Sequence, residues 1–291
     1  MKEILILSSK NYCNSKTTNY GDCILINTGS ELIIYDCGHE KHADTVIEYM
    51  SKNGFEKAIV ILSHNDSDHF DGILKLLDEN KISVIRTTLL LKYKAQILKK
   101  IDDKRKTQDS VAKQILDLYD NIAQLSGAPI EDIYEHPEDL CDEVSIIGPD
   151  FEYMIETVAK RLDGREGDMA DDETAINATS LQVKVEIGTN CLLLCGDCSY
   201  PAIEDIVRDY DAVQLPHHGK CKQADKIFEK KSDQSHSVYI VSDNTGNSNG
   251  GSDNLITTGH RVYNTKITGD ITINSSTFTS STYKTGRVLG I

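Results

Sequence analysis

The chain has 291 residues, of which 39% are hydrophobic, and a formal net charge of −15 at pH 7. No apolar run approaches the roughly eighteen residues of a membrane-spanning helix, so the composition excludes an integral membrane protein and leaves enough apolar residues for a buried core. The acidic balance argues against a chain-wide electrostatic surface for nucleic acid, although a local patch or a bound cation can still receive a phosphate.

The N-terminal segment MKEILILSS contains one short apolar stretch, from Ile4 to Leu7. This stretch is too short for a secretion signal, so we expect a first strand and a cytoplasmic protein. The eight cysteines are then expected to remain thiols rather than to form disulfides. Cys195 and Cys198 form a CxxC pair, but a single pair is weak evidence for zinc or redox chemistry, and two buried structural thiols are the simpler interpretation.

Hydrophobic periodicity in the first half predicts strands alternating with helices. The expected elements are a hairpin over 23–38, a helix carrying the stripe Val46, Ile47 and Met50, a strand over 58–62, a helix over 73–80, a strand over 82–91 and a strand over 144–148. Residues 92–125 are helical in pattern and basic from 92 to 113. We expect a helical insertion there, either with a solvated face or serving as a lid that grips substrate.

The second half repeats this order after a polar, acidic loop over 163–174. Its expected elements are strands over 181–187 and 191–197, a helix over 203–210, a strand over 212–219, a helix over 224–231, a strand over 237–244 and a β-rich tail over 261–281. No short-period repeat or heptad array is present. The pattern predicts one α/β domain over 1–291, built from two βα-containing halves of about 1–160 and 175–291.

The stretch ILSHNDSDHFDG, residues 61–72, follows the strand expected over 58–62. His64, Asp66, Asp68 and His69 give it the pattern H-x-D-x-D-H, and imidazole with carboxylate suits divalent zinc, manganese or iron. Taken singly, each residue would be interpreted as a satisfied core histidine or a turn-forming aspartate. Together in six positions at the end of a strand, they favour a metal site.

Two later strands also end in metal-ligand side chains. CLLLCGD ends at Asp197, and AVQLPHHG ends with His217 and His218. An aspartate after a strand is more often a helix cap, but strand ends in layered α/β proteins commonly form the rim of the active site. The combination therefore strengthens the prediction of a metal centre.

The order of these motifs resembles the metallo-β-lactamase superfamily: Asp36-Cys37-Gly38 after a strand, the H-x-D-x-D-H stretch, Gly196-Asp197, and Pro216-His217-His218-Gly219. More narrowly, the chain is similar to the metal-hydrolase domain of competence DNA-internalisation (ComEC-like) channel proteins, which also carry aspartate at the position of Asp66. The segment NYGDCILI, with Gly21 and Asp22, and the segment over 177–181 share this similarity. The resemblance extends from Tyr20 to about Asn274 and leaves out the basic insertion.

This resemblance implies an αββα sandwich with a dinuclear site at one edge of the two sheets. It implies two divalent metal ions, zinc or manganese, with iron also compatible. The implied ligands are His64 and Asp66 for the first metal, Asp68 and His69 for the second, Asp197 as a bridge, and His218. His217 is expected to support a ligand or contact the substrate, and Asp36 to hydrogen-bond a ligating residue.

The chain departs from the family pattern at three places. The usual third-motif histidine has no counterpart, because Asn177 and Ser180 stand in its place and are expected to lie behind the ligands; His136 is a possible substitute. Lys220 replaces the serine that follows the paired histidines in the competence group. The segment NTGNSNGGSDN, residues 244–254, replaces a later histidine-proline loop, and its part NGGSDN, residues 249–254, is expected to be a mobile loop near the site.

The expected activity is that of a metal-dependent hydrolase, above all a phosphodiesterase or nuclease that uses a metal-bound hydroxide. Asp68 is expected to orient the water or receive its proton, and Lys220 to stabilise developing negative charge, although a solvated lysine is an equal alternative. The expected partner is a phosphodiester or nucleic-acid substrate, with no membrane. Two alternatives remain: an acyl hydrolase acting on lactones or thioesters, and a non-catalytic metal-binding effector module.

Overall fold

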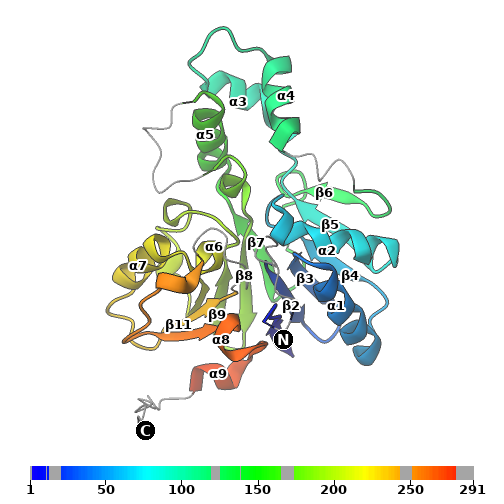
Figure 1. Cartoon of the computed structure of the whole chain (residues 1–291), viewed down its shortest axis with the longest axis vertical. Coiled ribbons are helices and arrows are strands. Elements are labelled where there is room, and N and C mark those ends of the chain that lie inside the picture. Colours follow the sequence, from blue (N-terminus) through cyan, green and yellow to red (C-terminus); the bar gives the residue numbers. More distant parts are fainter. Residues whose placement is uncertain are drawn as a thin grey trace.

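Two β-sheets pack face to face in the computed structural model, with helices on both outer faces (Figure 1). The structure describes residues 2–10, 12, 21–118, 125–137, 139–164, 174–242 and 251–279. Among these residues no helix is long and apolar enough to cross a membrane. The two packed sheets, with helices on both outer faces, confirm the predicted αββα sandwich.

The first sheet has seven described strands and the second has six. In spatial order the first contains β13 (Ile271–Ile273), β1 (Glu3–Ile6), β2 (Cys23–Asn27), β3 (Leu32–Cys37), β4 (Ala58–Ile61), β5 (Ile82–Thr87) and β6 (Ile130–Asp132). The second contains β12 (Arg261–Asn264), β11 (Val238–Val241), β10 (Ala212–Gln214), β9 (Asn190–Leu194), β8 (Gln182–Ile187) and β7 (Val144–Gly148). β7 comes from the first half of the chain but joins the second sheet, and β13 comes from the second half but pairs with β1. The two sheets therefore do not coincide with the two halves of the sequence.

Each sheet combines an antiparallel part with a parallel part. β2 and β3 form the expected antiparallel hairpin, and β3 to β6 then run parallel, as do β9 to β12 in the second sheet. Parallel neighbours need a crossover, and helices supply several of them. These are α1 (Glu40–Asn53) and α2 (Ser67–Asp78) on the first sheet and α7 (Cys221–Lys230) on the second.

Three apolar clusters hold the four layers together. The central cluster lies between the sheets and includes Ile24, Ile33, Val183, Leu194 and Ile240. A second cluster packs α1 and α2 on the outer face of the first sheet, and a third packs α7 on the outer face of the second. Strands that are covered on both faces become continuous apolar runs, which is why β2, β3 and β11 are buried along their whole length.

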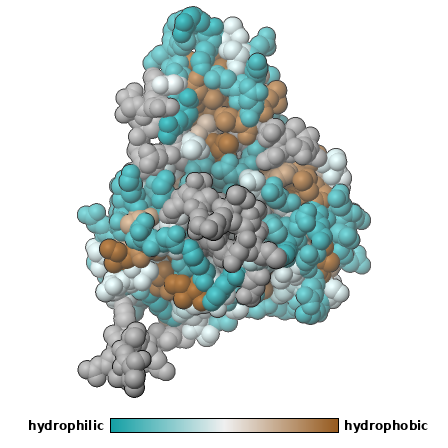
Figure 2. All heavy atoms as spheres, viewed as in Figure 1, coloured by the Kyte–Doolittle hydropathy of each residue, from teal (hydrophilic) through white to brown (hydrophobic). Residues whose placement is uncertain are grey.

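The expected helical insertion forms an arm that rises from the sandwich (Figure 1). α3 (Lys94–Lys100) and α4 (Gln108–Leu118) pack with α5 (Phe151–Leu162) around Ile97, Val111 and Met154. Figure 2 shows hydrophilic residues at the tip and sides of this arm, with hydrophobic residues between them. Part of its basic charge is paired internally, because Lys100 lies 3.0 Å from Glu152 and 2.9 Å from Glu156.

The structure corrects the expected helices at two places. α2 begins at Ser67, so Asp68 and His69 lie in its first turn and not in a loop that leads to a helix at residue 73. Residues 203–210 form turns with a short 3₁₀ segment, Val207–Asp209, instead of an α-helix. Their β-branched residues favour helix weakly, and Tyr210 must already be extended to enter β10.

The remaining helices are short. They are α6 (Pro216–Gly219), α8 (Thr265–Thr268) and α9 (Ser275–Thr279). Most of the polar loop expected over 163–174 lies outside the described residues, as does the first part of the segment over 249–254. The described end of the segment over 249–254 contains Ser252, which lies beside Gly219, the last residue of α6.

Candidate metal centre

The candidate site lies where strands of both sheets end. His64 follows β4 in the first sheet, and Asp36 is the penultimate residue of β3. Asp197 follows β9 and His218 follows β10 in the second sheet. β3 runs parallel to β4 and β9 to β10, so the carboxyl end of each pair delivers its side chains to one sheet edge.

His69 lies between two buried carboxylates. Its Nδ1 is 2.8 Å from Asp36 Oδ2, and its Nε2 is 3.3 Å from Asp197 Oδ1. An ionised carboxylate can only accept, so in the neutral form that can bind a metal the imidazole would donate its Nδ1–H to Asp36 and direct the Nε2 lone pair towards Asp197. A carboxylate behind the imidazole is the usual support of a metal-ligating histidine.

Ser63 gives His64 the same orientation. Ser63 donates both its N–H and its Oγ–H to Asp36 at 2.6 Å, and its Oγ lies 2.9 Å from Nδ1 of His64. Because the hydroxyl proton is committed to Asp36, the oxygen accepts from Nδ1–H of His64. The Nε2 lone pair of His64 then faces Asp66 Oδ2 at 3.4 Å and Asp197 Oδ2 at 4.0 Å.

His218 is held from the opposite sheet. Its Nδ1 lies 3.0 Å from the carbonyl oxygen of Ser242, which can only accept, so the proton of the neutral ring sits on Nδ1. Its Nε2 lies 3.1 Å from Asp68 Oδ2 and 3.7 Å from Asp197 Oδ2. All three histidines thus turn Nε2 towards the same carboxylate, Asp197.

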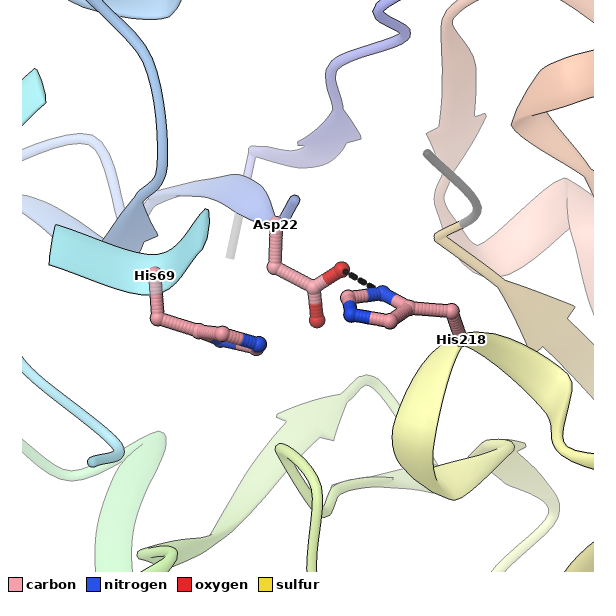
Figure 3. A group of neighbouring side chains, drawn as sticks. All are labelled: Asp22, His69 and His218. Atoms are coloured by element: carbon pink, nitrogen blue, oxygen red, sulfur yellow. Dashed lines mark ion pairs between the residues drawn. The ribbon is translucent and has the colours of Figure 1, made fainter. Parts of the chain in front are cut away.

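Asp22 is a site residue to which the sequence assigned no role. Its carboxylate lies between His69 and His218, with Oδ1 3.2 Å from Nδ1 of His218, as Figure 3 shows. Gln214 of β10 donates to its other oxygen. The sequence signals were the aspartate directly before the apolar run of β2 and its place in the segment NYGDCILI, and neither shows the partners of Asp22, which come from distant parts of the chain.

Two glycines hold the start of α2 against the first sheet. A Cβ on Gly21 would lie 1.4 Å from the carbonyl oxygen of Asp68, and a Cβ on Gly38 would lie 1.8 Å from it. The same oxygen accepts a hydrogen bond from the N–H of Asp22 at 3.0 Å. Only residues without a side chain allow this approach, so these glycines fix the position of Asp68.

The electrostatics of the site follow from burial and close charges. Burial raises the pKa of Asp68, but the hydrogen bond with His218 and the charge of His69 outweigh it and lower this pKa to about 2. Burial likewise raises the pKa of Asp197, yet His218, His69 and His217 hold it well below its ordinary value. Burial lowers the pKa of His69, but the carboxylates of Asp197 and Asp36 hold it well above the ordinary value.

The buried donor atoms fit a divalent cation. His64 Nε2, His69 Nε2 and Asp197 Oδ1 have no hydrogen-bond partner within the described part of the chain. Leaving such atoms unpaired costs about 1–3 kcal/mol each, unless an ion binds them. Among the described residues, His64, His69 and Asp197 form one group with ligand atoms within 4.8 Å of one another, and Asp22, His69 and His218 form a second.

The other predicted site residues lie around this centre. Asn177 Nδ2 is 3.3 Å from Nδ1 of His217, which is 3.6 Å from Asp197 Oδ2. Ser180 is buried at the end of the same segment. The Asp197 carboxylate raises the pKa of His217, but burial and the charges of His218 and Lys220 outweigh it, so the net shift is downward. His136 lines a separate cavity with Pro137 and Pro149.

Seven cysteines lie within the described residues, and none of these seven forms a disulfide. Cys195 and Cys198 are both buried. They pack in the apolar cluster on the outer face of the second sheet, together with Leu193 and Val213. This placement agrees with the interpretation of the CxxC pair as structural thiols.

Comparison with known proteins identifies the family. The family model of the metallo-β-lactamase superfamily matches residues 17–242, and the chain belongs to this superfamily. No curated protein sequence matches the chain. Members of the superfamily are mostly metal-dependent hydrolases that bind divalent metals, typically zinc. With its clustered histidines and aspartates, the chain is a metal-dependent hydrolase of this class.

Solved structures share the fold at low sequence identity. The metallo-β-lactamase fold protein YhfI from Bacillus subtilis has a TM-score of 0.52 at 11% identity, over 94% of this chain and 99% of that chain. Tm1679, described as a metal-dependent hydrolase of the β-lactamase superfamily, has a TM-score of 0.51 at 12% identity, over 94% of this chain and 98% of that chain. At such identities the similarity supports the fold alone.

Proposed function

We propose that the protein is a phosphodiesterase or nuclease that works with two divalent ions, zinc or manganese, with iron also compatible. The observation that carries the proposal is the position of Asp197 between two sets of donors. Its Oδ1 lies 3.3 Å from His69, and its Oδ2 lies 4.0 Å from His64. A carboxylate shared in this way is suited to bridge two ions, and paired ions suit the displacement of an oxygen at phosphorus.

The donors divide into two groups around this bridge. The first-site group is His64, Asp66 and Asp197, and the second-site group is Asp68, His69, His218 and Asp197. When bound, such ions lower the pKa of a water and stabilise the charge that develops on phosphoryl oxygens. The side chain of Asp66 is 40% exposed, whereas His64 is buried, so substrate would approach from the side of Asp66.

Asp68 and Lys220 would act directly on the reacting groups. With a pKa of about 2, Asp68 is ionised at neutral pH. Its carboxylate is therefore better suited to orient a nucleophilic water than to retain a proton taken from that water. Lys220 follows α6 beside His217, where its positive charge could stabilise a developing oxyanion. Asp36, through His69 and Ser63, would keep the ligands in position.

The charge distribution favours a small phosphodiester or a short single strand over long duplex. The net charge is −15, and lysines of the basic insertion are partly neutralised by acidic neighbours such as Glu135, Glu152 and Glu156. A long duplex needs many unpaired cations along its backbone. The motif similarity to the ComEC-like hydrolase domains supports a nucleic-acid substrate. A short single strand is then the largest substrate that we expect.

The test is hydrolysis by metal-stripped protein that has been reloaded with manganese or zinc. The substrates are bis-p-nitrophenyl phosphate and labelled single- and double-stranded DNA and RNA. We expect activity that requires metal and is absent from Asp68→Ala, while the surface variant Asp44→Ala keeps it. Metal binding without any phosphodiester cleavage would refute the proposal, and would favour acyl substrates or a binding role.

A further inference from the structure

We propose that His217 is the third side-chain ligand of the first-site metal, counted apart from the shared Asp197, and so replaces the third-motif histidine that this chain lacks. The inference rests on the two-metal function proposed above. From the sequence alone, His217 was expected to support a ligand or to contact substrate. Its position in the structure assigns it a more specific role.

His217 faces the bridging carboxylate at Oδ2, the oxygen that lies near both His64 and His218. Its Nδ1 lies 3.6 Å from Asp197 Oδ2, the same oxygen that lies 4.0 Å from Nε2 of His64. The N–H of His217 also donates to the carbonyl oxygen of Gly196 at 3.1 Å. The residue is thus tied to the neighbour of Asp197 through its backbone, while its ring is directed at the carboxylate.

The backbone of α6 is bent so that two consecutive histidines reach one carboxylate. His217 has φ 53° and ψ 53°, and His218 has φ 55° and ψ 30°, both in the left-handed region. For residues with a side chain this conformation costs about 1–2 kcal/mol each. The rings are 6.1 Å apart and inclined by 70°, so they approach Asp197 from different directions. A role for His218 alone would leave the strain at His217 unexplained.

Asn177, which stands where the third-motif histidine is expected, contacts the His217 ring. Its Nδ2 lies 3.3 Å from His217 Nδ1, and its Oδ1 has no hydrogen-bond partner among the residues that the structure describes. Asn177 is 4% exposed, so this orphaned oxygen is buried beside the centre. Because the amide donates to it, Nδ1 of His217 is the ring atom with a lone pair, and a cation bound there would replace this long hydrogen bond from Asn177.

His217 also completes a ligand set that is otherwise incomplete. The first-site group contains one imidazole and two carboxylates, whereas the second-site group contains two imidazoles on its own. Three protein donors together with an open position are usual for a catalytic zinc site, and once the shared Asp197 is set aside, His64 and Asp66 are the only two donors of the first-site group itself. The His217 side chain is 23% exposed, so it can bind an ion while the site stays open to substrate.

The experiment measures metal content rather than turnover. Full-length protein is stripped, reloaded with zinc and desalted, and bound metal is counted by mass spectrometry; cobalt(II) absorption reports the donor set independently. The variants are His217→Asn and His217→Gln, and asparagine tolerates the left-handed backbone. His217→Asn combined with Asn177→His tests rescue from the third-motif position. The exposed His236→Asn is the matched control.

We expect about one equivalent of metal fewer in both His217 variants, or at least a tenfold weaker affinity for one ion, with a changed cobalt spectrum. The double variant should recover the lost ion, and the control should match the wild type. Equal metal content and spectra in all proteins would overturn the inference. Loss of one ion without phosphodiester hydrolysis by the wild type would support it and refute the proposed function. Phosphodiester hydrolysis by the wild type, with unchanged metal content in the His217 variants, would support the proposed function and overturn the inference about His217.

Discussion

Asp36 Oδ2 lies 2.8 Å from Nδ1 of His69, on the opposite side of the ring from Asp197. Asp36 has φ 58°, a left-handed conformation that aspartate and asparagine adopt more readily than most residues. The strained backbone brings a carboxylate behind the histidine, where it fixes which nitrogen carries the proton. Asp36 therefore determines the direction of the lone pair without contacting the metal itself.

Asp36→Asn should weaken metal binding about 10- to 100-fold while the fold remains intact. The asparagine amide can still accept from Ser63, but its N–H₂ would face Nδ1 of His69 and shift the ring proton to Nε2, the atom that should bind the ion. Isothermal titration with zinc or manganese measures the change. Asp44→Asn, a surface aspartate paired with Lys75, should bind like the wild type. Equal affinities in all three proteins would contradict the prediction.

Gly38→Ala should destabilise the protein by about 1–3 kcal/mol and also reduce metal affinity. The new Cβ would meet the carbonyl oxygen of Asp68, so the start of α2 must move away from the first sheet. Urea unfolding and metal titration measure the two effects. Gly54→Ala is the matched control, because Gly54 caps α1 at φ 78° with no atom within 4 Å of the added Cβ. We expect its cost to be limited to stability.

Zinc or manganese should raise the melting temperature of the metal-stripped protein by several degrees. An ion that binds only the folded state adds about 2.7 kcal/mol when it is present at 100 times its dissociation constant. Thermal unfolding with and without chelator measures the shift. Asp197→Asn removes the shared carboxylate and should abolish most of it. A melting temperature that does not respond to metal in the wild type would show that these donors hold no ion.

Lys231 should make stability depend on pH above neutrality. Its buried Nζ lies 2.7 Å from the carbonyl oxygen of Tyr210 and 3.1 Å from that of Val207, and burial lowers its pKa from 10.5 to about 8. Between these two values the unfolded chain holds the proton and the folded chain does not. The free energy of unfolding should therefore rise by on the order of 1–3 kcal/mol between pH 8 and 10.5. Below pH 8 the ionisation of Lys231 should add no pH dependence.

Urea unfolding of Lys231→Met at several pH values between 7 and 10.5 tests this contribution. The variant should be less stable overall, because three acceptors around Lys231 lose their donor, and its profile should lack the rise. Lys230→Met, on the same helix but nearer the surface, is the control for loss of a lysine. Parallel pH profiles for Lys231→Met and the wild type would contradict the prediction.

Local patterns were enough to predict the layers and the motifs at the strand ends. The hairpin of β2 and β3 follows from apolar runs around a turn, and His64, Asp197 and His218 are recognised because each follows an apolar strand. The start of α2 was misplaced, since Ser67 and Asp68 also favour turns. The segment over 203–210 was misassigned because buried positions in successive turns can imitate the spacing of a helix.

Residues that depend on tertiary contacts could not be predicted in the same way. Asp22 contacts Gln214, and Ser242 accepts from His218 through its backbone carbonyl, which no residue type reveals. Ser63 is an ordinary serine in the sequence, and only the fold places its hydroxyl between Asp36 and His64. The candidate donors are therefore visible in the sequence, while the groups that orient them emerge only from packing.

The donors of the candidate metal centre come from both sheets. His64, Asp68 and His69 belong to the first sheet and its helix α2, whereas Asp197 and His218 follow strands of the second. The donor set is complete only while the sandwich is closed, so any opening of the two sheets would also separate the donors from one another. A fragment ending after β6 would lack the bridging carboxylate, and one beginning at β7 would lack His64 and His69. Neither fragment could react alone, and activity would return only by complementation of the two.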